Sequence, residues 1–85
     1  MKEFKYTITD PLGMHARPAG LFVKEATSCK GSVKIIKREK SVDAKKIFGV
    51  MGLAVKCGEE VTVTVEGPDE DTEAAKLEGF MKNNL

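Results

Sequence analysis

The stretch Val61-Thr62-Val63-Thr64-Val65-Glu66 alternates valine with a polar residue along its whole length. A period of two is typical of a β-strand with one face turned towards a core and the other towards solvent. Gly67-Pro68 ends the stretch, because proline has no N–H to donate to a strand ladder. The segment therefore predicts one strand of a sheet with a solvated second face, which is typical of antiparallel sheets.

Three other segments predict strands of the same sheet. Residues 4–9 alternate apolar and polar side chains up to a turn at residues 10–13, which is Asp-Pro-Leu-Gly. Residues 32–35 alternate in the same way, and a polar hairpin turn over residues 37–40 leads to a short strand over residues 40–43. That turn lacks the Asn-Gly pair that is most typical of two-residue hairpins.

Apolar residues at helical spacing predict helices in three places. The first helix covers residues 16–28, where apolar side chains recur every three or four positions. The second covers residues 44–53, although Gly49 and Gly52 weaken it. The third begins near residue 69 with a cluster of acidic side chains, which complement the helix dipole, and its apolar face extends to residue 81.

The predicted elements follow one another in the order βαββαβα, without a linker, a low-complexity segment or a repeat. Residues 1–85 are therefore expected to form one domain of the α+β class. In this open-faced sandwich, a four-stranded sheet is covered on one face by the helices. A chain of 85 residues buries about 60–65% of its unfolded surface, which leaves little room for an enclosed catalytic cleft.

The amino-acid composition argues against several classes of function. The chain is 41% hydrophobic and 32% charged with a net charge of +1, so no basic field favours nucleic acid. No apolar run is long enough for membrane insertion, and the first residues lack the apolar core of a signal peptide. Cys29 and Cys57, with one histidine, cannot supply a four-ligand zinc site unless carboxylates contribute. We expect a cytoplasmic protein with reduced thiols, no metal and no cofactor, and nothing demands more than a monomer.

The only histidine, His15, lies in the run Gly13-Met14-His15-Ala16-Arg17-Pro18-Ala19 at the start of the first predicted helix. A helix N-terminus has unpaired N–H groups and a partial positive charge, which suit an anion such as phosphate. Pro18 suits the first turn of a helix, and Arg17 offers a planar clamp for phosphate oxygens. The motif is compatible with a transient phosphohistidine. A lone histidine near a helix start is more often an ordinary surface or capping residue, so the motif alone leaves both interpretations open.

Residues 13–19 resemble the active-site signature of the HPr family, the histidine-containing phosphocarriers of the bacterial phosphoenolpyruvate:sugar phosphotransferase system. Residues 44–53 are similar to the family's regulatory-site segment, and residues 63–67 with Asp69-Glu70 are similar to a third part. The resemblance covers nearly the whole chain. It implies a strand order of 1-4-2-3 in an antiparallel sheet, with the three helices on one face.

The resemblance also implies a role for the motif. His15 would accept a phosphoryl group on Nδ1 from phosphorylated Enzyme I and pass it to a histidine of a sugar-specific EIIA domain. Arg17 and the backbone of Ala16, Pro18 and Ala19 would stabilise the phosphoryl group, since such transfer depends mainly on positioning and charge. The chain would therefore be a covalent carrier in sugar uptake rather than an enzyme.

Some apolar residues are not required to fill a core of this size, and we predict that they form the surface that binds partner proteins. Gly20 and Leu21 lie off the buried stripe of the first predicted helix, near His15. Ile47, Phe48 and Met51 match positions at which the family docks its partners. Exposed Met and Phe suit a surface that binds several partners. Spacing alone would instead place the last three side chains in the core, whereas the resemblance favours the surface.

The sequence departs from the family's pattern at two positions. Many Gram-positive relatives have a regulatory serine, the target of HPr kinase, where this chain has Lys46. A lysine has no hydroxyl, so this form of control is not expected, while the His15 relay is unaffected. Leu12 replaces a residue that is commonly polar, so the loop before His15 is expected to pack differently.

Three functions are compatible with these observations. The first is a phosphocarrier for sugar transport, with Enzyme I and EIIA domains as partners. The second is a specialised paralogue that acts as a regulatory binding module, so that regulatory proteins are a further class of partner. The third is a small α+β interaction domain unrelated to transfer. The presence of both His15 and Arg17 favours the first two.

Overall fold

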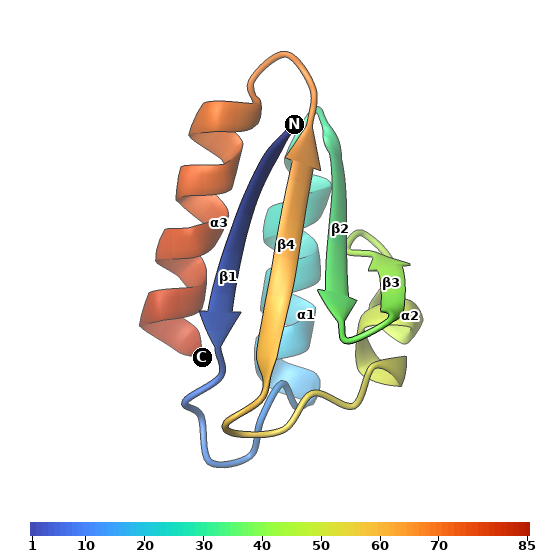
Figure 1. Cartoon of the computed structure of the whole chain (residues 1–85), viewed down its shortest axis with the longest axis vertical. Helices are drawn as coiled ribbons and strands as arrows, with labels where there is room; N and C mark the ends of the chain where they lie inside the picture. Colours follow the sequence, from blue (N-terminus) through green and yellow to red (C-terminus); the bar gives the residue numbers. More distant parts are fainter.

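Strand β4 (Glu60–Glu66) lies inside a four-stranded antiparallel sheet in the order β1-β4-β2-β3 (Figure 1). The computed structural model describes all residues from Met1 to Leu85. The predicted α+β class and strand order are confirmed. The other elements, in chain order, are β1 (Lys2–Thr7), α1 (Ala16–Thr27), β2 (Ser32–Lys37), β3 (Lys40–Asp43), α2 (Ile47–Gly52) and α3 (Glu70–Asn84).

The valines of β4 form the centre of the core. Val61, Val63 and Val65 have exposed fractions of 0%. Val63 pairs with Phe4 of β1 on one side and with Ile35 of β2 on the other. Because β4 is hydrogen-bonded along both edges, it fixes the positions of β1 and β2 relative to each other.

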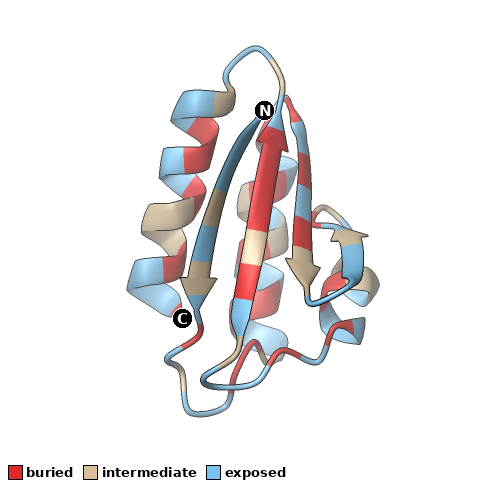
Figure 2. Cartoon of the chain, in the orientation of Figure 1, coloured by how far each residue is buried: buried red, intermediate tan, exposed pale blue.

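The helices lie on one face of the sheet, as predicted. Helices α1 and α3 pack side by side along it, and the short α2 packs against α1 and β3 (Figure 1). Their inward side chains Phe22, Leu77 and Met81 are fully buried, and the ring of Phe22 lies 6.1 Å from that of Phe80. Figure 2 shows the buried positions concentrated along β4 and on the sides of the helices that face it.

The second helix is shorter than the sequence predicts. Residues 44–46 form a turn before α2 begins at Ile47. Ala44 donates its N–H to the carbonyl of Val33 at 2.9 Å, and Lys45 donates its N–H to Oδ1 of Asp43 at 2.9 Å. An aspartate that binds the backbone two residues ahead competes with helix formation, which explains the late start.

The first strand is also shifted from its predicted position. It begins at Lys2 and ends at Thr7, and its inward residues Phe4 and Tyr6 are only half-buried because β1 is an edge strand. Ile8, predicted as part of this strand, lies just beyond it and is almost completely buried, at 1% exposure. The predicted apolar face formed by Phe4, Tyr6 and Ile8 is therefore present, but its most buried residue, Ile8, lies in the loop after β1.

Both cysteines are free thiols. Cys29 lies after α1 at one end of the molecule, and Cys57 lies in the loop before β4 at the other (Figure 1). Burial raises the pKa of the Cys29 thiol, with a further contribution from the nearby carboxylate of Glu73. No helix in the structure combines the length and the apolar character that crossing a bilayer requires.

A buried carboxylate joins α3 to the connection between α1 and β2. Glu73 has an exposed fraction of 9%. Its Oε2 accepts the N–H of Lys30 at 2.6 Å, and its Oε1 accepts the N–H of Gly31 at 3.2 Å. One side chain therefore satisfies two backbone donors that are about forty residues away in sequence.

We predict that Glu73→Gln lowers the free energy of unfolding by about 1–3 kcal/mol, because an amide offers one acceptor oxygen and leaves one N–H unpaired. Chemical denaturation measures the effect. Glu78→Gln, a half-exposed position on the same helix, is the matched control and should change little. Equal losses for the two variants would contradict the role assigned to Glu73.

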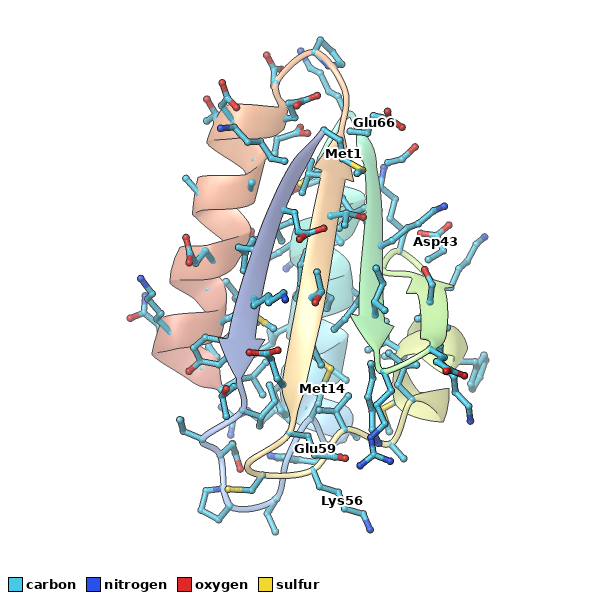
Figure 3. All side chains as sticks on the ribbon, in the orientation of Figure 1. Met1, Met14, Asp43, Lys56, Glu59 and Glu66 are labelled. Atoms are coloured by element: carbon cyan, nitrogen blue, oxygen red, sulfur yellow. The ribbon has the colours of Figure 1, made fainter.

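A second carboxylate joins the loops near the other end of the sheet, where Figure 3 labels Lys56 and Glu59. Glu59 accepts the N–H of Lys56 at 2.7 Å and pairs with Nζ of Lys37 at 3.1 Å. Nζ of Lys37 also donates to the carbonyls of Leu53 and Ala54 after α2. The backbone N–H of Lys56, followed by the ammonium of Lys37, lowers the pKa of Glu59 below its ordinary 4.5.

A carboxylate with a lowered folded-state pKa stabilises the fold above its ordinary pKa, and this stability is lost as pH falls through the folded value. We therefore predict that the wild type loses more stability between about pH 6 and pH 3 than Glu59→Gln does. Urea unfolding at several pH values checks this, with the exposed Glu39→Gln as control. Parallel pH curves for wild type and Glu59→Gln would refute it.

Candidate functional site

The loop before α1 is held against the core and places His15 at its end. Met14 is buried and donates its N–H to the carbonyl of Val55 at 2.9 Å. Gly13 adopts a φ of +71°, and a Cβ there would lie 2.4 Å from the oxygen of Val55. Only glycine fits this backbone approach, so the position of His15 depends on it.

His15 is the N-cap residue of α1, with extended backbone angles and no capping hydrogen bond from its side chain. Its imidazole is 36% exposed and therefore open to a partner. The N–H groups of Ala16 and Arg17 lie in the first turn and have no acceptor within the helix. The side chain of His15 does not cap them either. The structure thus combines an accessible imidazole with unpaired donors, as the anion-site interpretation requires.

Two of the predicted backbone donors have to be corrected. Pro18 has no N–H, and the N–H of Ala19 is already bonded to the carbonyl of His15 at 2.9 Å. Both residues are buried and form the base of the first turn. The backbone donors available to an anion are therefore those of Ala16 and Arg17.

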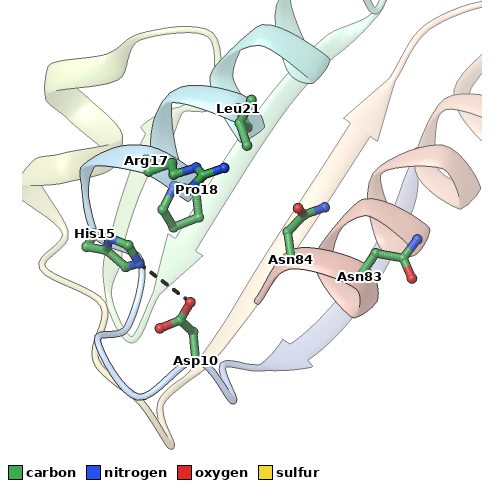
Figure 4. Close-up of a pocket in the computed structure, with 7 residues that line it drawn as sticks. All are labelled: Asp10, His15, Arg17, Pro18, Leu21, Asn83 and Asn84. Atoms are coloured by element: carbon green, nitrogen blue, oxygen red, sulfur yellow. Dashed lines mark ion pairs between the residues drawn. The ribbon is translucent and has the colours of Figure 1, made fainter.

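An open hollow of about 290 Å³ lies beside His15 (Figure 4). It is formed by the loop after β1, the first turns of α1 and the end of α3. The guanidinium of Arg17 is exposed and supplies the positive charge of the hollow. The residues that line it are Asp10, His15, Arg17, Pro18, Leu21, Asn83 and Asn84.

Asp10 contacts the imidazole. Its Oδ2 lies 3.5 Å from Nε2 of His15, as the dashed line in Figure 4 marks. The sequence predicts Asp10 only as part of a turn, and in the structure its Oδ1 accepts the N–H of Leu12 at 2.9 Å. Asn83 and Asn84 were not predicted to be near the site, and no local signal could reveal a contact made across the whole chain.

The residues predicted for partner binding divide into two groups. Phe48 is 88% exposed, and Leu21 and Met51 are 42% and 38% exposed, as expected for a docking surface. Gly20 is also exposed. Ile47 is half-buried and packs against the core, which agrees with the alternative that spacing alone favoured.

Lys46 is the exposed N-cap residue of α2, so the position at which the resemblance implies a regulatory serine lies at the observed start of this helix. Ser41 lies within β3. Nowhere in the structure do three or more His, Cys, Asp or Glu side chains gather in a group that could hold a metal ion.

The model of the family described as "PTS HPr component phosphorylation site" matches residues 2–83. The chain belongs to the HPr family. Within this family, the chain is 48% identical over 71 residues to the phosphocarrier protein HPr of Lysinibacillus sphaericus, covering 84% of this chain and 81% of that protein. It is 39% identical over 85 residues to the HPr-like protein Crh of Bacillus subtilis, covering 100% of both.

Solved HPr structures have the same fold. HPr-C-His from Thermoanaerobacter tengcongensis superimposes with a TM-score of 0.94 at 37% identity, covering 99% of this chain and 94% of that one. The selenomethionyl Crh of Bacillus subtilis, crystallised as a dimer with a swapped domain, gives a TM-score of 0.77 at 39% identity, covering 100% and 98%. As a member of the HPr family, this chain has the role of a phosphocarrier of the phosphotransferase system.

Proposed function

We propose that His15 carries the phosphoryl group, which it receives from phosphorylated Enzyme I and passes to sugar-specific EIIA domains. The observation that supports this most strongly is the position of an accessible imidazole at the open N-terminus of α1, next to Arg17. An exposed site suits a carrier, because the same group has to be reached by a donor and then by an acceptor.

Each step is a displacement at phosphorus. The lone pair of Nδ1 of His15 forms a bond to phosphorus, while the P–N bond of the donor's phosphohistidine breaks and its electron pair returns to the donor nitrogen. The N–H groups of Ala16 and Arg17, with the guanidinium of Arg17, stabilise the charge on the phosphoryl oxygens. Transfer to an acceptor histidine is the same reaction in reverse.

The exposed apolar side chains provide the docking surface for these partners. Leu21 lies on α1 next to the hollow, and Phe48 and Met51 lie on α2, which packs against α1. Gly20, next to Leu21 on α1, leaves the surface open, since a Cβ there would meet nothing within 4 Å. Ile47 supports this surface from the core side.

We propose that the carrier works as a monomer, in which the site is complete within one chain. A regulatory role is a second candidate, favoured by the full-length similarity to Crh. A regulatory module would still accept a phosphoryl group on His15, but it would not restore sugar uptake in a strain that lacks HPr. Complementation of uptake separates the two functions, and regulatory proteins would be the partners in the second.

The test of the carrier function is phosphorylation by Enzyme I and phosphoenolpyruvate. We predict that the wild type gains one phosphoryl group and that His15→Ala gains none while keeping its fold, because His15 is N-cap to α1 and not part of the core. Intact mass spectrometry reads the phosphoryl group, and circular dichroism checks the fold. An added phosphoryl group on the folded His15→Ala variant would remove His15 from the mechanism.

Arg17 can be separated from docking by a conservative change. Lysine keeps the charge but loses the planar pair of donors, so Arg17→Lys should lower the transfer rate at saturating partner roughly tenfold and leave the affinity for the partner nearly unchanged. Rapid-quench measurements with phosphorylated Enzyme I give both quantities. An unchanged transfer rate at saturating partner would show that the guanidinium of Arg17 does not contribute to the transfer step.

Lys46 predicts the absence of control by HPr kinase. A lysine can neither accept a phosphoryl group in serine's manner nor imitate phosphoserine, since its charge has the opposite sign. Ser41 lies within β3, before the turn that precedes α2, and not at the position that matches the family's serine. We expect kinase treatment to leave the mass and the His15 transfer rate unchanged. Stoichiometric phosphoserine at Ser41, or a kinase-dependent loss of transfer, would refute this.

A further inference from the structure

We propose that Asp10 is a positioning residue for His15. Its carboxylate holds the imidazole in the tautomer that carries the proton on Nε2, so that Nδ1 presents a lone pair to the phosphoryl donor. The consequence for transfer rests on the proposed function, whereas the tautomer is a property of the free protein and can be measured without any phosphoryl donor.

The carboxylate of Asp10 is held in place by the backbone. Its Oδ1 accepts the N–H of Leu12 at 2.9 Å, and the N–H of Asp10 itself donates to the backbone oxygen of Leu85 at 2.8 Å. With one oxygen engaged, the other, Oδ2, faces Nε2 of His15 at 3.5 Å (Figure 4). An ionised carboxylate only accepts hydrogen bonds, so the ring nitrogen opposite it is favoured as the protonated one.

No other acidic side chain competes for this arrangement. Asp10 is the only acidic residue that lines the hollow. Arg17 lines it too, but no ion pair joins its guanidinium to Asp10. The other polar residues, Asn83 and Asn84, are uncharged and come from the end of α3. Among the side chains that line the hollow, Asp10 therefore supplies the only negative charge near Nε2.

The same contact helps the ring during transfer. When the Nδ1 lone pair forms the bond to phosphorus and the donor's P–N bond breaks, Nε2 keeps its proton. The electron pair of the broken bond leaves with the donor nitrogen, and the phosphorylated ring of His15 gains one positive charge. Asp10 faces that charge from the side opposite to the phosphoryl group, and this stabilises the product and the transition state that leads to it.

The tautomer can be read directly by nitrogen-15 NMR, because His15 is the only histidine and gives every imidazole signal. The spectra are recorded at about pH 9. We expect the Nε2–H form to dominate in the wild type. In Asp10→Asn the amide can turn its N–H₂ towards Nε2 and so favour the Nδ1–H form. Asp10→Glu should return part of the signal to Nε2–H, and the exposed Asp71→Asn should match the wild type.

The second readout uses phosphoramidate, a small donor that needs no protein docking. Phosphorylation of Nδ1 should be roughly five- to tenfold slower in Asp10→Asn than in the wild type or Asp71→Asn, which is the size expected for one opposite charge at this distance in a well-hydrated site. Equal rates, or an Asp10→Asn spectrum identical to that of the wild type, would overturn the proposal.

The two proposals fail in different ways. If the wild type accepts no phosphoryl group from phosphoramidate or from phosphorylated Enzyme I, the carrier function fails, while a tautomer change in Asp10→Asn still supports Asp10 as a positioning residue. If the wild type is phosphorylated and the tautomer of Asp10→Asn is unchanged, the carrier function stands and the role of Asp10 is refuted.

Discussion

The site depends on one constraint, the pairing of strand β4 along both of its edges. This pairing fixes the sheet order and buries Val61, Val63 and Val65 under the helices. The connection that leads into β4 is fixed with it, and the carbonyl of Val55 in that connection accepts the N–H of Met14. The next residue is His15, so the core of the sheet determines where the imidazole lies.

In this arrangement the inner side of the first turn of α1 is packed against the core, and its outer side is open to solvent. Pro18 and Ala19 are buried in the first turn of α1, whereas Ala16 and Arg17 face outward. A group attached to His15 would therefore meet helix N–H groups and a guanidinium without being enclosed. Such a site binds an anion by fixed dipoles and still allows large partners to approach, which a carrier between two proteins needs.

The sequence predicts the parts of this structure that depend on local patterns. The alternation from Val61 to Glu66 places β4, and the motif around His15 places the start of α1. The second helix is predicted too long because apolar spacing does not reveal the turn at Asp43, which binds the backbone of Lys45. Local patterns set the element types, while competing side-chain hydrogen bonds set their ends.

The site itself is only partly predictable. The signature identifies His15 and Arg17, but the contact of Asp10 with the imidazole depends on how the loop folds back. The approach of Asn83 and Asn84 depends on α3 lying beside α1, a contact across most of the chain that no local pattern encodes. The resemblance to the HPr family favours an exposed surface on α2. The structure adds that Phe48 and Met51 of this helix are exposed.

The open N-terminus of α1 is expected to hold the phosphoryl group on His15. The most direct measurement compares amide proton–nitrogen NMR spectra before and after phosphorylation. We expect the largest downfield proton shifts at Ala16 and Arg17, whose N–H groups are free to bind phosphoryl oxygens. The amide proton of Ala19, which is bonded to the carbonyl of His15, should shift far less. Unshifted Ala16 and Arg17 amides in a fully phosphorylated sample would contradict it.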